Sequence, residues 1–252
     1  MAQRLDGRTA LVTGSTSGIG RAIAIAFAAE GAHVAVSGRD DARGAATVAA
    51  IREAGGRADF VRADLGASAD AARALAGEGT RALGGRVDVL VNNAGIFPSA
   101  PTAEVDQATF DSVIATNVRG PFFLVAALAP SMAERGSGVI INIGSWISTI
   151  GLSSGALYGA SKGTLEALTR GWAAEFGRSG VRINAIAPGV TLTDGTAHLQ
   201  DHTRAMVDAT PAGRFGTPED VAAAAVYLAS DDASFMHGST LLIDGGALTT
   251  RA

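Results

Sequence analysis

Short apolar runs alternate with longer Ala-rich segments along the whole chain, and this alternation restricts the fold more than any other feature. The apolar runs predict strands at 9–13, 33–37, 58–63, 87–91, 138–143, 181–187 and 239–244. Segments with helical spacing lie between them at 18–30, 41–54, 68–83, 104–134 and 155–178, and a further helix fits 218–229. Nearly continuous apolar strands separated by helices are typical of a parallel sheet covered on both faces. We therefore expect one α/β domain over residues 1–252, a three-layer, Rossmann-type, doubly wound parallel sheet of about seven strands.

Composition argues against several other classes of protein. Hydrophobic residues make up 47% of the chain, enough for a sizeable core, and aromatic residues only 5%. The chain has no cysteine, which excludes disulfides, Cys-based zinc sites and thiol catalysis. A net charge of −4 with scattered Arg argues against a nucleic-acid surface. No apolar run approaches the roughly 18 residues of a membrane span, and the N-terminus lacks a signal-peptide pattern. We expect a soluble, cytoplasmic protein with no nucleic-acid or membrane partner.

The first predicted strand enters the first predicted helix through TGSTSGIG, residues 13–20. Gly14, Gly18 and Gly20 would let the backbone approach a pyrophosphate, while the helix N-terminus supplies N–H donors. Their spacing is GxxxGxG instead of the usual dinucleotide pattern GxGxxG. The turn predicts a dinucleotide site, with a ligand-free Gly-rich turn as the alternative.

The end of the second predicted strand, AVSGRDD, bears on the choice of cofactor. In NAD-binding folds an acidic residue near this point takes the ribose 2′-OH. Here Gly38 stands at that place and Arg39 follows, so Arg39 could pair with a 2′-phosphate and Ser37 could donate to it. This pattern favours NADP(H). NAD(H) stays possible if Asp40 or Asp41 is the ribose ligand.

Polar residues also follow the third and fourth predicted strands. Asp64 would either reach an adenine amino group or cap the following helix. The sequence NNAG at 92–95 would allow a ligand close to the backbone, although these residues are also common turn formers.

Lys162 is the only lysine, and it lies four residues after Tyr158 in a predicted helix, so the two share a face. An ammonium about 5 Å from the phenol, at an effective dielectric of about 20, would stabilise the phenolate by roughly 3 kcal/mol, about two pK units. We therefore predict a lowered pKa for Tyr158 and a role as general acid/base. The alternative is a surface pair with chance spacing.

Three more polar residues fit around this pair. Ser145 follows the fifth predicted strand and could hydrogen-bond the same substrate oxygen as Tyr158, and Ser148 is a less well placed competitor. Both could instead be turn formers. Asn117 lies inside a predicted helix, where Asn is a poor helix former. Its amide could hold a water that relays protons to Lys162, or it could mark a helix irregularity.

Together these residues resemble the short-chain dehydrogenase/reductase family in its single-domain form, over about residues 6–246. The shared motifs are TGSTSGIG (13–20), ADL (63–65), NNAG (92–95), N (117), INIGS (141–145), YGASK (158–162), IAPG (186–189) and IDGG (243–246). The resemblance implies that Tyr158 is the general acid/base and that Lys162 lowers its pKa and binds the ribose. It further implies that Ser145 orients the substrate oxygen and that Asn117 completes a proton relay.

The resemblance also assigns cofactor contacts to many residues. The pyrophosphate would contact Thr13, Gly14, Ser17, Gly18, Ile19 and Gly20; adenine would contact Asp64, beside Leu65; the adenosine ribose would contact Asn92, Ala94 and Gly95; and the nicotinamide would contact Pro188, Gly189 and Thr193. Two residues depart from the family pattern. Ser17 stands where many NADP-dependent members have a basic residue, and Trp146 follows Ser145 where a small residue is common. Trp146 would shape the substrate pocket or simply pack.

The implied activity is that of an NAD(P)-dependent oxidoreductase. A hydride would pass between nicotinamide C4 and a carbonyl or alcohol carbon of a small molecule, while Tyr158 transfers the proton. A 3-oxoacyl thioester, a ketone, a sugar or a steroid all fit this chemistry. A non-catalytic nucleotide-sensing protein on the same fold is the alternative, but it would not need the whole tetrad. A sugar-nucleotide epimerase would need a longer chain.

The resemblance and the sequence lead to three further expectations. The segment at about 190–213 is predicted to form a mobile lid over the substrate. His198 and His202 within it are spaced i, i+4 but lack a third ligand, so no metal site is expected. Family analogy predicts a homotetramer.

Overall fold

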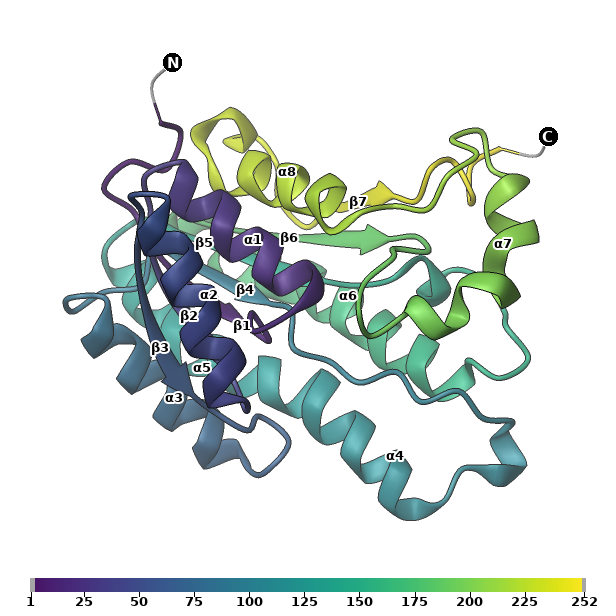
Figure 1. Ribbon diagram of the computed structural model, residues 1–252. Coiled ribbons are helices and arrows are strands. Elements are labelled where there is room, and N and C mark those ends of the chain that lie inside the picture. The colour runs from purple at the N-terminus through teal and green to yellow at the C-terminus, as the bar shows by residue number, and fades with distance from the viewer. Residues whose placement is uncertain (1–2, 251–252) are drawn as a thin grey trace.

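The computed structural model describes residues 3–250 and contains a seven-stranded sheet in which every neighbouring pair of strands is parallel (Figure 1). The strand order is β3-β2-β1-β4-β5-β6-β7, so the direction of winding reverses between β1 and β4. The strands are β1 Thr9–Thr13, β2 His33–Gly38, β3 Arg57–Arg62, β4 Val89–Asn92, β5 Gly138–Ile143, β6 Val181–Pro188 and β7 Thr240–Ile243. The predicted fold class is confirmed.

Helices cover both faces of this sheet and complete three layers. The helices are α1 Gly18–Ala29, α2 Asp41–Glu53, α3 Ala69–Ala82, α4 Gln107–Ile114, α5 Gly120–Glu134, α6 Ala156–Phe176, α7 Gln200–Asp208 and α8 Pro218–Ala229. Side chains alternate between the faces of a strand. Ala10 and Val12 of β1 therefore join one core with α1, α2 and α8, whereas Leu11 joins a second core with α3, α5 and α6.

The long helix predicted at 104–134 begins at Gln107 and contains a π-helical turn. The π-helical turn Ala115–Arg119 separates α4 from α5, and Pro121 stands in the first turn of α5. Proline has no N–H, so it cannot make the α-helical hydrogen bond to the carbonyl of residue 117. The prediction of a helix is therefore confirmed from Gln107 to Glu134, with an irregularity at this turn that Pro121 signals in the sequence.

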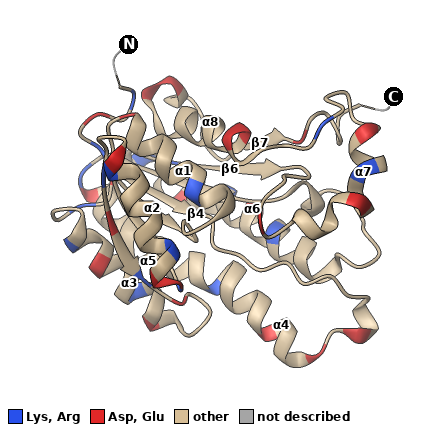
Figure 2. Cartoon of the chain, in the orientation of Figure 1, with Lys and Arg blue, Asp and Glu red and all other residues tan. Residues whose placement is uncertain are grey.

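Within residues 3–250, one helical stretch, Gln107–Glu134, is long and apolar enough by length and composition to cross a membrane. Half of its most apolar window is buried inside the protein, and a core helix passes the same test. In the view of Figure 2, Lys and Arg are interspersed with Asp and Glu over the helices and loops.

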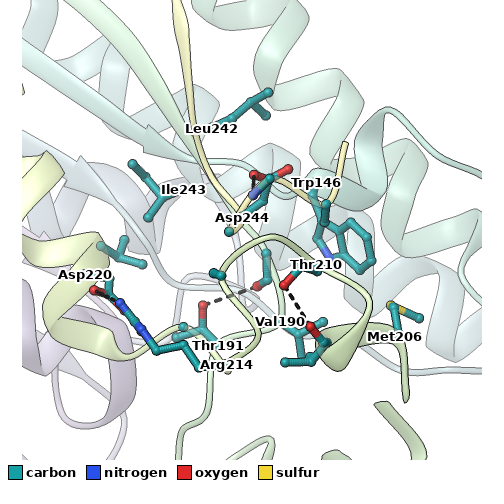
Figure 3. Close-up of a pocket in the computed structure, with 18 of the residues that line it drawn as sticks. Trp146, Val190, Thr191, Met206, Thr210, Arg214, Asp220, Leu242, Ile243 and Asp244 are labelled. Atoms are coloured by element: carbon teal, nitrogen blue, oxygen red, sulfur yellow. Dashed lines mark hydrogen bonds and ion pairs between the residues drawn. The ribbon is translucent and has the colours of Figure 1, made fainter. Parts of the chain in front are cut away.

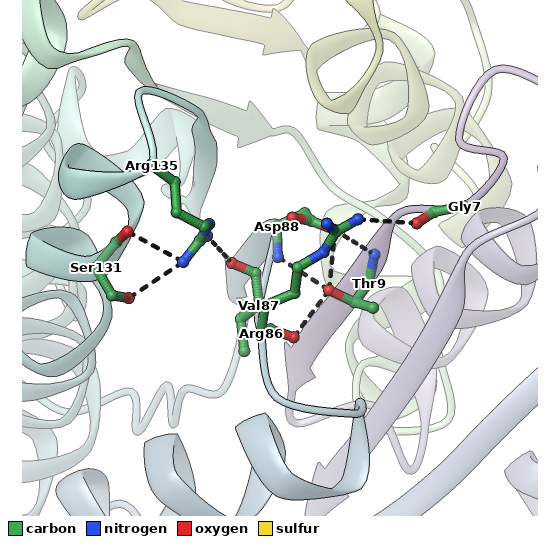
Figure 4. A network of polar contacts seen from close by, with 7 residues as sticks. All are labelled: Gly7, Thr9, Arg86, Val87, Asp88, Ser131 and Arg135. Carbon is green, nitrogen blue, oxygen red and sulfur yellow. Dashed lines mark hydrogen bonds and ion pairs between the residues drawn. The ribbon is translucent and has the colours of Figure 1, made fainter.

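A polar network ties together the amino-terminal ends of β1 and β4 (Figure 4). The carboxylate of Asp88, just before β4, accepts hydrogen bonds from the Thr9 backbone N–H at 2.9 Å and from Arg86 Nε at 3.2 Å. Arg135, at the end of α5, donates to the Val87 carbonyl at 2.9 Å. These contacts between protein groups hold the amino-terminal ends of the strands together, whereas a cleft lies at the carboxyl-terminal ends.

Candidate active site

A cleft of about 690 Å³ runs along the carboxyl-terminal ends of the strands. It begins at Ser37 and Arg39 after β2, passes the turn between β1 and α1, and continues beyond Ser145 and Tyr158 to Phe215. Its centre lies where the strand order reverses, between β1 and β4. This switch point is where doubly wound sheets bind their ligands.

The glycine turn needs its glycines for both conformation and space. Gly14 and Gly18 have φ angles of +62° and +52°, which favour glycine. A Cβ on Gly14 would lie 2.8 Å from the Cα of Ala94. The side chain of Asn93, which the sequence analysis left without a role, donates to the carbonyls of Thr13 at 2.9 Å and Gly14 at 3.0 Å. Asn93 thus holds the turn against the end of β4, and its place in NNAG was the only sequence signal.

The N-terminus of α1 differs from those of its neighbours. Helices α2, α3 and α8 are capped by the side chains of Asp40, Ser68 and Thr217. The N-cap of α1, Ser17, makes no side-chain capping bond, and the first turn of α1 lines the cleft. Backbone N–H groups left open at a helix N-terminus attract an anion. The residues present therefore fit a pyrophosphate group.

Two arginines and two aspartates line the end of the cleft beside β2. Arg39 is exposed and lines the cleft, and so does Arg43, which the sequence analysis did not single out. Asp40 caps α2 and pairs with Arg43 Nε at 2.8 Å, so its carboxylate is already engaged. A Cβ on Gly38 would lie 2.6 Å from Cγ2 of Thr16, so an acidic side chain at position 38 would require Thr16 to move.

Two predicted adenosine-side residues, Asp64 and Asn92, make side-chain hydrogen bonds to protein groups. Asp64 lines the cleft, as does Leu65, but Asp64 does not cap α3. Its Oδ1 accepts from the Gly66 N–H at 3.0 Å instead. Asn92 lies outside the cleft lining: its buried side chain donates to Asn142 Oδ1 at 2.8 Å, within the sheet. Because β4 extends through Asn92, its side chain is directed into the sheet, and the contact of Asn92 with the ribose stays a prediction.

The first two turns of α6 bring Tyr158 and Lys162 to the cleft. Lys162 is buried, its Nζ donates to the Ile143 carbonyl at 2.8 Å, and Nζ lies 5.8 Å from the centre of the Tyr158 ring. Phe97 covers the ring edge-on at a centroid distance of 6.3 Å. The i, i+4 pairing predicted from the sequence is present, and the ammonium faces the phenol ring.

The prediction of a lowered pKa for Tyr158 was wrong for the protein without a bound cofactor. Burial raises the pKa of Tyr158, and the hydrogen bond from Ser145 lowers it by less. Burial also lowers the pKa of Lys162 to about 8, against the opposing influence of the Glu166 charge. The prediction counted the attraction between ammonium and phenolate but omitted the cost of removing each charge from water.

Ser145 lies just after the end of β5 and lines the cleft. It is the N-cap of the short 3-10 helix Trp146–Ser148, and its Oγ accepts from the Ile147 N–H at 3.3 Å. Ser148 turns away, because its hydroxyl lies 2.7 Å from the Glu166 carboxylate. Ser145 therefore lines the cleft, and Ser148 does not.

Asn117, in the π-helical turn, is buried behind the cleft and does not line it. Its Nδ2 donates to the Ile96 carbonyl at 2.9 Å and to Ser161 Oγ at 3.0 Å, and its Oδ1 accepts from the Ile96 N–H at 2.9 Å. Both amide protons are therefore committed to protein groups. A relay water could meet this side chain only by donating to Oδ1, and the helix irregularity expected as the alternative is present.

The remaining predicted cofactor residues line the cleft. They are Thr13, Ile19, Gly20, Ala94, Gly95, Pro188, Gly189 and Thr193. The segment 190–213 also contributes Leu199, Thr203 and Met206 to the lining, and it contains α7, which the sequence analysis did not predict. In Figure 1 the arrows of β6 and β7 point toward the side on which α7 lies. His198 and His202 are exposed, and residues 3–250 contain no group of three His, Asp or Glu side chains able to hold a metal ion.

Comparison with known proteins gives consistent matches over nearly the full length. A family model described as enoyl-(acyl carrier protein) reductase matches residues 14–248. The chain is 42% identical over 246 residues to D-threitol dehydrogenase of Mycolicibacterium smegmatis, covering 96% of this chain and 94% of that protein. A solved short chain dehydrogenase/reductase family protein superposes with a TM-score of 0.90 at 47% identity, covering 98% of this chain and all of that one (100%). A 3-oxoacyl (acyl-carrier-protein) reductase from Agrobacterium tumefaciens C58, solved with NADP bound, superposes with a TM-score of 0.91 at 32% identity over 97% and 95% of the two chains.

Proposed function

The chain belongs to the short-chain dehydrogenase/reductase family of NAD(P)-dependent oxidoreductases acting on CH–OH and C=O groups, and from this premise we propose that it interconverts an uncharged secondary alcohol and its ketone, using NADP(H). The observation that carries the proposal is the cleft at the switch point, which joins an anion-binding helix N-terminus to Ser145, Tyr158 and Lys162. The bound nicotinamide would supply the hydride donor or acceptor. Residues of this chain would carry out every other step.

Three side chains around the reacting carbon would transfer the proton, orient the substrate oxygen and stabilise the phenolate. Tyr158, whose pKa burial raises, keeps its proton at neutral pH and is suited to donate it to a carbonyl oxygen. Ser145 would orient that oxygen from the end of β5. The Lys162 ammonium would stabilise the phenolate left after proton transfer, from 5.8 Å beneath the ring. In the oxidation direction the same groups would act in reverse.

The substrate part of the cleft carries no charge among the described residues. The charged lining residues of the whole cleft are Arg39, Asp40, Arg43, Asp64 and Lys162. The first four lie at the adenosine end, and Lys162 lies under the tyrosine. Beyond Tyr158 the polar lining consists of hydroxyls, among them Ser99, Ser153 and Thr203, beside apolar side chains such as Leu152 and Phe215.

A buried carboxylate or sulfonate needs a partner charge, and this part of the cleft offers none. Hydroxyl-bearing neutral compounds, such as short alditols and simple secondary alcohols, would find donors and acceptors without that cost. That D-threitol dehydrogenase is a relative supports this choice. A 3-oxoacyl thioester is the second candidate, supported by the analogy to the acyl-carrier-protein reductase structure.

A substrate panel tests the proposal. Oxidation of threitol, galactitol and butan-2-ol would be compared with oxidation of gluconate, and reduction of butanone with reduction of a 3-oxoacyl thioester, each with both cofactors. We expect the highest kcat/KM on a neutral compound. Preferred turnover of gluconate would refute the uncharged class, and preferred turnover of the thioester would favour the second candidate.

The acid/base assignment has its own test. Tyr158→Phe removes the transferable proton but keeps the ring, so turnover should fall by about 10²–10⁴. Binding of NADPH, followed by fluorescence titration, should stay near that of the wild type, since the glycine turn is unaffected. Retained turnover would refute the role of Tyr158. Loss of NADPH binding in the wild type, or no turnover across the panel, would favour the non-catalytic nucleotide-sensing alternative.

We also propose that segment 190–213 closes over the substrate and that the protein is a cytoplasmic homotetramer, both by family analogy. Exposed apolar side chains support association: Phe110 on α4 and Phe122 on α5 are 50% and 42% exposed, and Leu242 on the edge strand β7 is 40% exposed. Light scattering coupled to size-exclusion chromatography tests the tetramer. A monomer at micromolar concentration would refute it.

A further inference from the structure

A second cavity of about 550 Å³ lies beside the cleft, between β7, α8 and the segment after β6 (Figure 3). Leu242, Ile243 and Asp244 line it from β7 and the residue that follows. Trp146, Met206 and Val190 line both this cavity and the cleft, together with Gly189 and Thr191. The two spaces are therefore neighbours that share a wall.

Trp146 is the largest side chain in that wall. It directly follows Ser145, and it is only 6% exposed. Figure 3 shows its indole at the margin of the second cavity, above Met206. Because Trp146 directly follows Ser145 and lines both spaces, the shared wall adjoins the part of the cleft that Ser145 lines.

The charged groups of the second cavity are already paired with protein groups. Arg214 donates to both oxygens of Asp220, at 2.7 and 3.0 Å. The Asp244 carboxylate accepts from the N–H groups of Gly246 and Leu248, at 2.9 and 3.0 Å. An ionic ligand would have to displace these partners, whereas an apolar group would pack against Ile243 and Met206 without that cost.

We propose that Trp146 is a specificity-determining residue, whose indole closes the substrate part of the cleft against the second cavity and so limits the size of the apolar group carried by the reacting carbon. This inference rests on the proposed function, because it places a ketone or alcohol at Ser145 and Tyr158. Shortening Trp146 joins the two spaces and gives the substrate an apolar extension. The sequence left open whether Trp146 shapes the substrate pocket or simply packs, and it gave no sign of the second cavity.

The test uses three ketones of increasing length: methyl ethyl, methyl butyl and methyl hexyl ketone. Their kcat/KM values with NADPH are compared in the wild type, Trp146→Ala and Trp146→Phe. Trp172 provides the matched control, since it is also 6% exposed, packs against Phe122 at 6.0 Å and lines neither space. Trp172→Phe removes the same volume as Trp146→Phe without touching the wall.

In Trp146→Ala, the ratio of kcat/KM for the methyl hexyl to the methyl ethyl ketone should rise at least about tenfold, since one methylene in a hydrophobic pocket is worth about 10–200-fold. In Trp146→Phe the same ratio should rise by a smaller factor. This variant still tests the proposal if the alanine variant folds poorly. Trp172→Phe should leave the ratio unchanged. An unchanged ratio in both Trp146 variants, or an equal rise in Trp172→Phe, would overturn the proposal.

A binding measurement separates this inference from the proposed function. The methyl hexyl ketone should raise the Tm of Trp146→Ala more than that of the wild type, because a ligand that binds only the folded state stabilises it. If the wild type reduces none of the ketones, the proposed activity on simple ketones fails. The Tm comparison then still decides whether Trp146 closes the second cavity: a larger shift in the variant supports it, and equal shifts overturn it.

Discussion

Lys162 should lose its proton near pH 8, and the chain is unusually well suited to show this. Its ordinary pKa of 10.5 falls to about 8 because the ammonium is buried. The difference of about 2.5 pK units corresponds to about 3 kcal/mol, at roughly 1.4 kcal/mol per unit. Between these two pH values the unfolded chain binds more protons than the folded one. The free energy of unfolding should therefore rise by about 3 kcal/mol from pH 8 to pH 10.5 through this residue alone.

A single lysine makes the titration directly observable. With ¹³C-labelled lysine, the protein should show one set of side-chain signals, and their shift with pH should have a midpoint near 8. Urea unfolding of the wild type and of Lys162→Met at pH 7, 8.5 and 10 supplies the energy, since the variant keeps every other titratable group. The variant should lack the rise that the wild type shows.

Either measurement can refute the reasoning. A midpoint near 10 would mean that the ammonium is solvated or more strongly paired than its hydrogen bond to Ile143 at 2.8 Å indicates. Parallel pH profiles for the wild type and Lys162→Met would mean that Lys162 adds nothing to the pH dependence. The same midpoint bears on catalysis, because half of the positive charge beneath Tyr158 is lost at about pH 8.

Three further predictions concern cofactor choice and stability. Arg39→Ala should lower kcat/KM with NADPH by about 10–100-fold and leave the value with NADH nearly unchanged, as expected for the loss of one charge-assisted hydrogen bond. An equal loss with both cofactors would refute the role of Arg39. Arg43→Ala, measured with the same two cofactors, is the comparison variant. Asn93→Ala removes two hydrogen bonds to the glycine turn at Thr13 and Gly14 and should weaken NADPH binding in a fluorescence titration, whereas unaltered affinity would show that the turn holds its shape without Asn93. Arg182→Met leaves three backbone carbonyls at and after the end of α8 without their donor and should lower the free energy of unfolding by about 3 kcal/mol or more; a loss below about 1 kcal/mol in urea unfolding would refute this role.

Several features could be read from the sequence because they depend on local patterns. The apolar periodicity predicted all seven strands to within two residues at each end. Turns that follow parallel strands meet at one end of the sheet, and for this reason the motifs after β1, β4 and β5 lie together. Ser145 and Tyr158 accordingly line the same cleft as Gly14.

Other features were decided by neighbours distant in the sequence. Asn92 and Asn93 are adjacent and chemically alike, yet one is buried in the sheet against Asn142 and the other holds the glycine turn. The direction of each side chain follows from where β4 ends, which its pairing with β5 helps to set. No local pattern distinguishes the two residues.

The sequence by itself determined the fold class, the glycine turn and the spacing of Tyr158 and Lys162, because strand and helix periodicity and i, i+4 proximity are properties of short segments. Only the tertiary structure decided the sign of the Tyr158 pKa shift and the second cavity behind Trp146. Both depend on how completely distant segments exclude water and fill space around a side chain. A pair of ionisable residues four positions apart can be recognised in the sequence, but the free-energy cost of removing the pair from water depends on the folded protein.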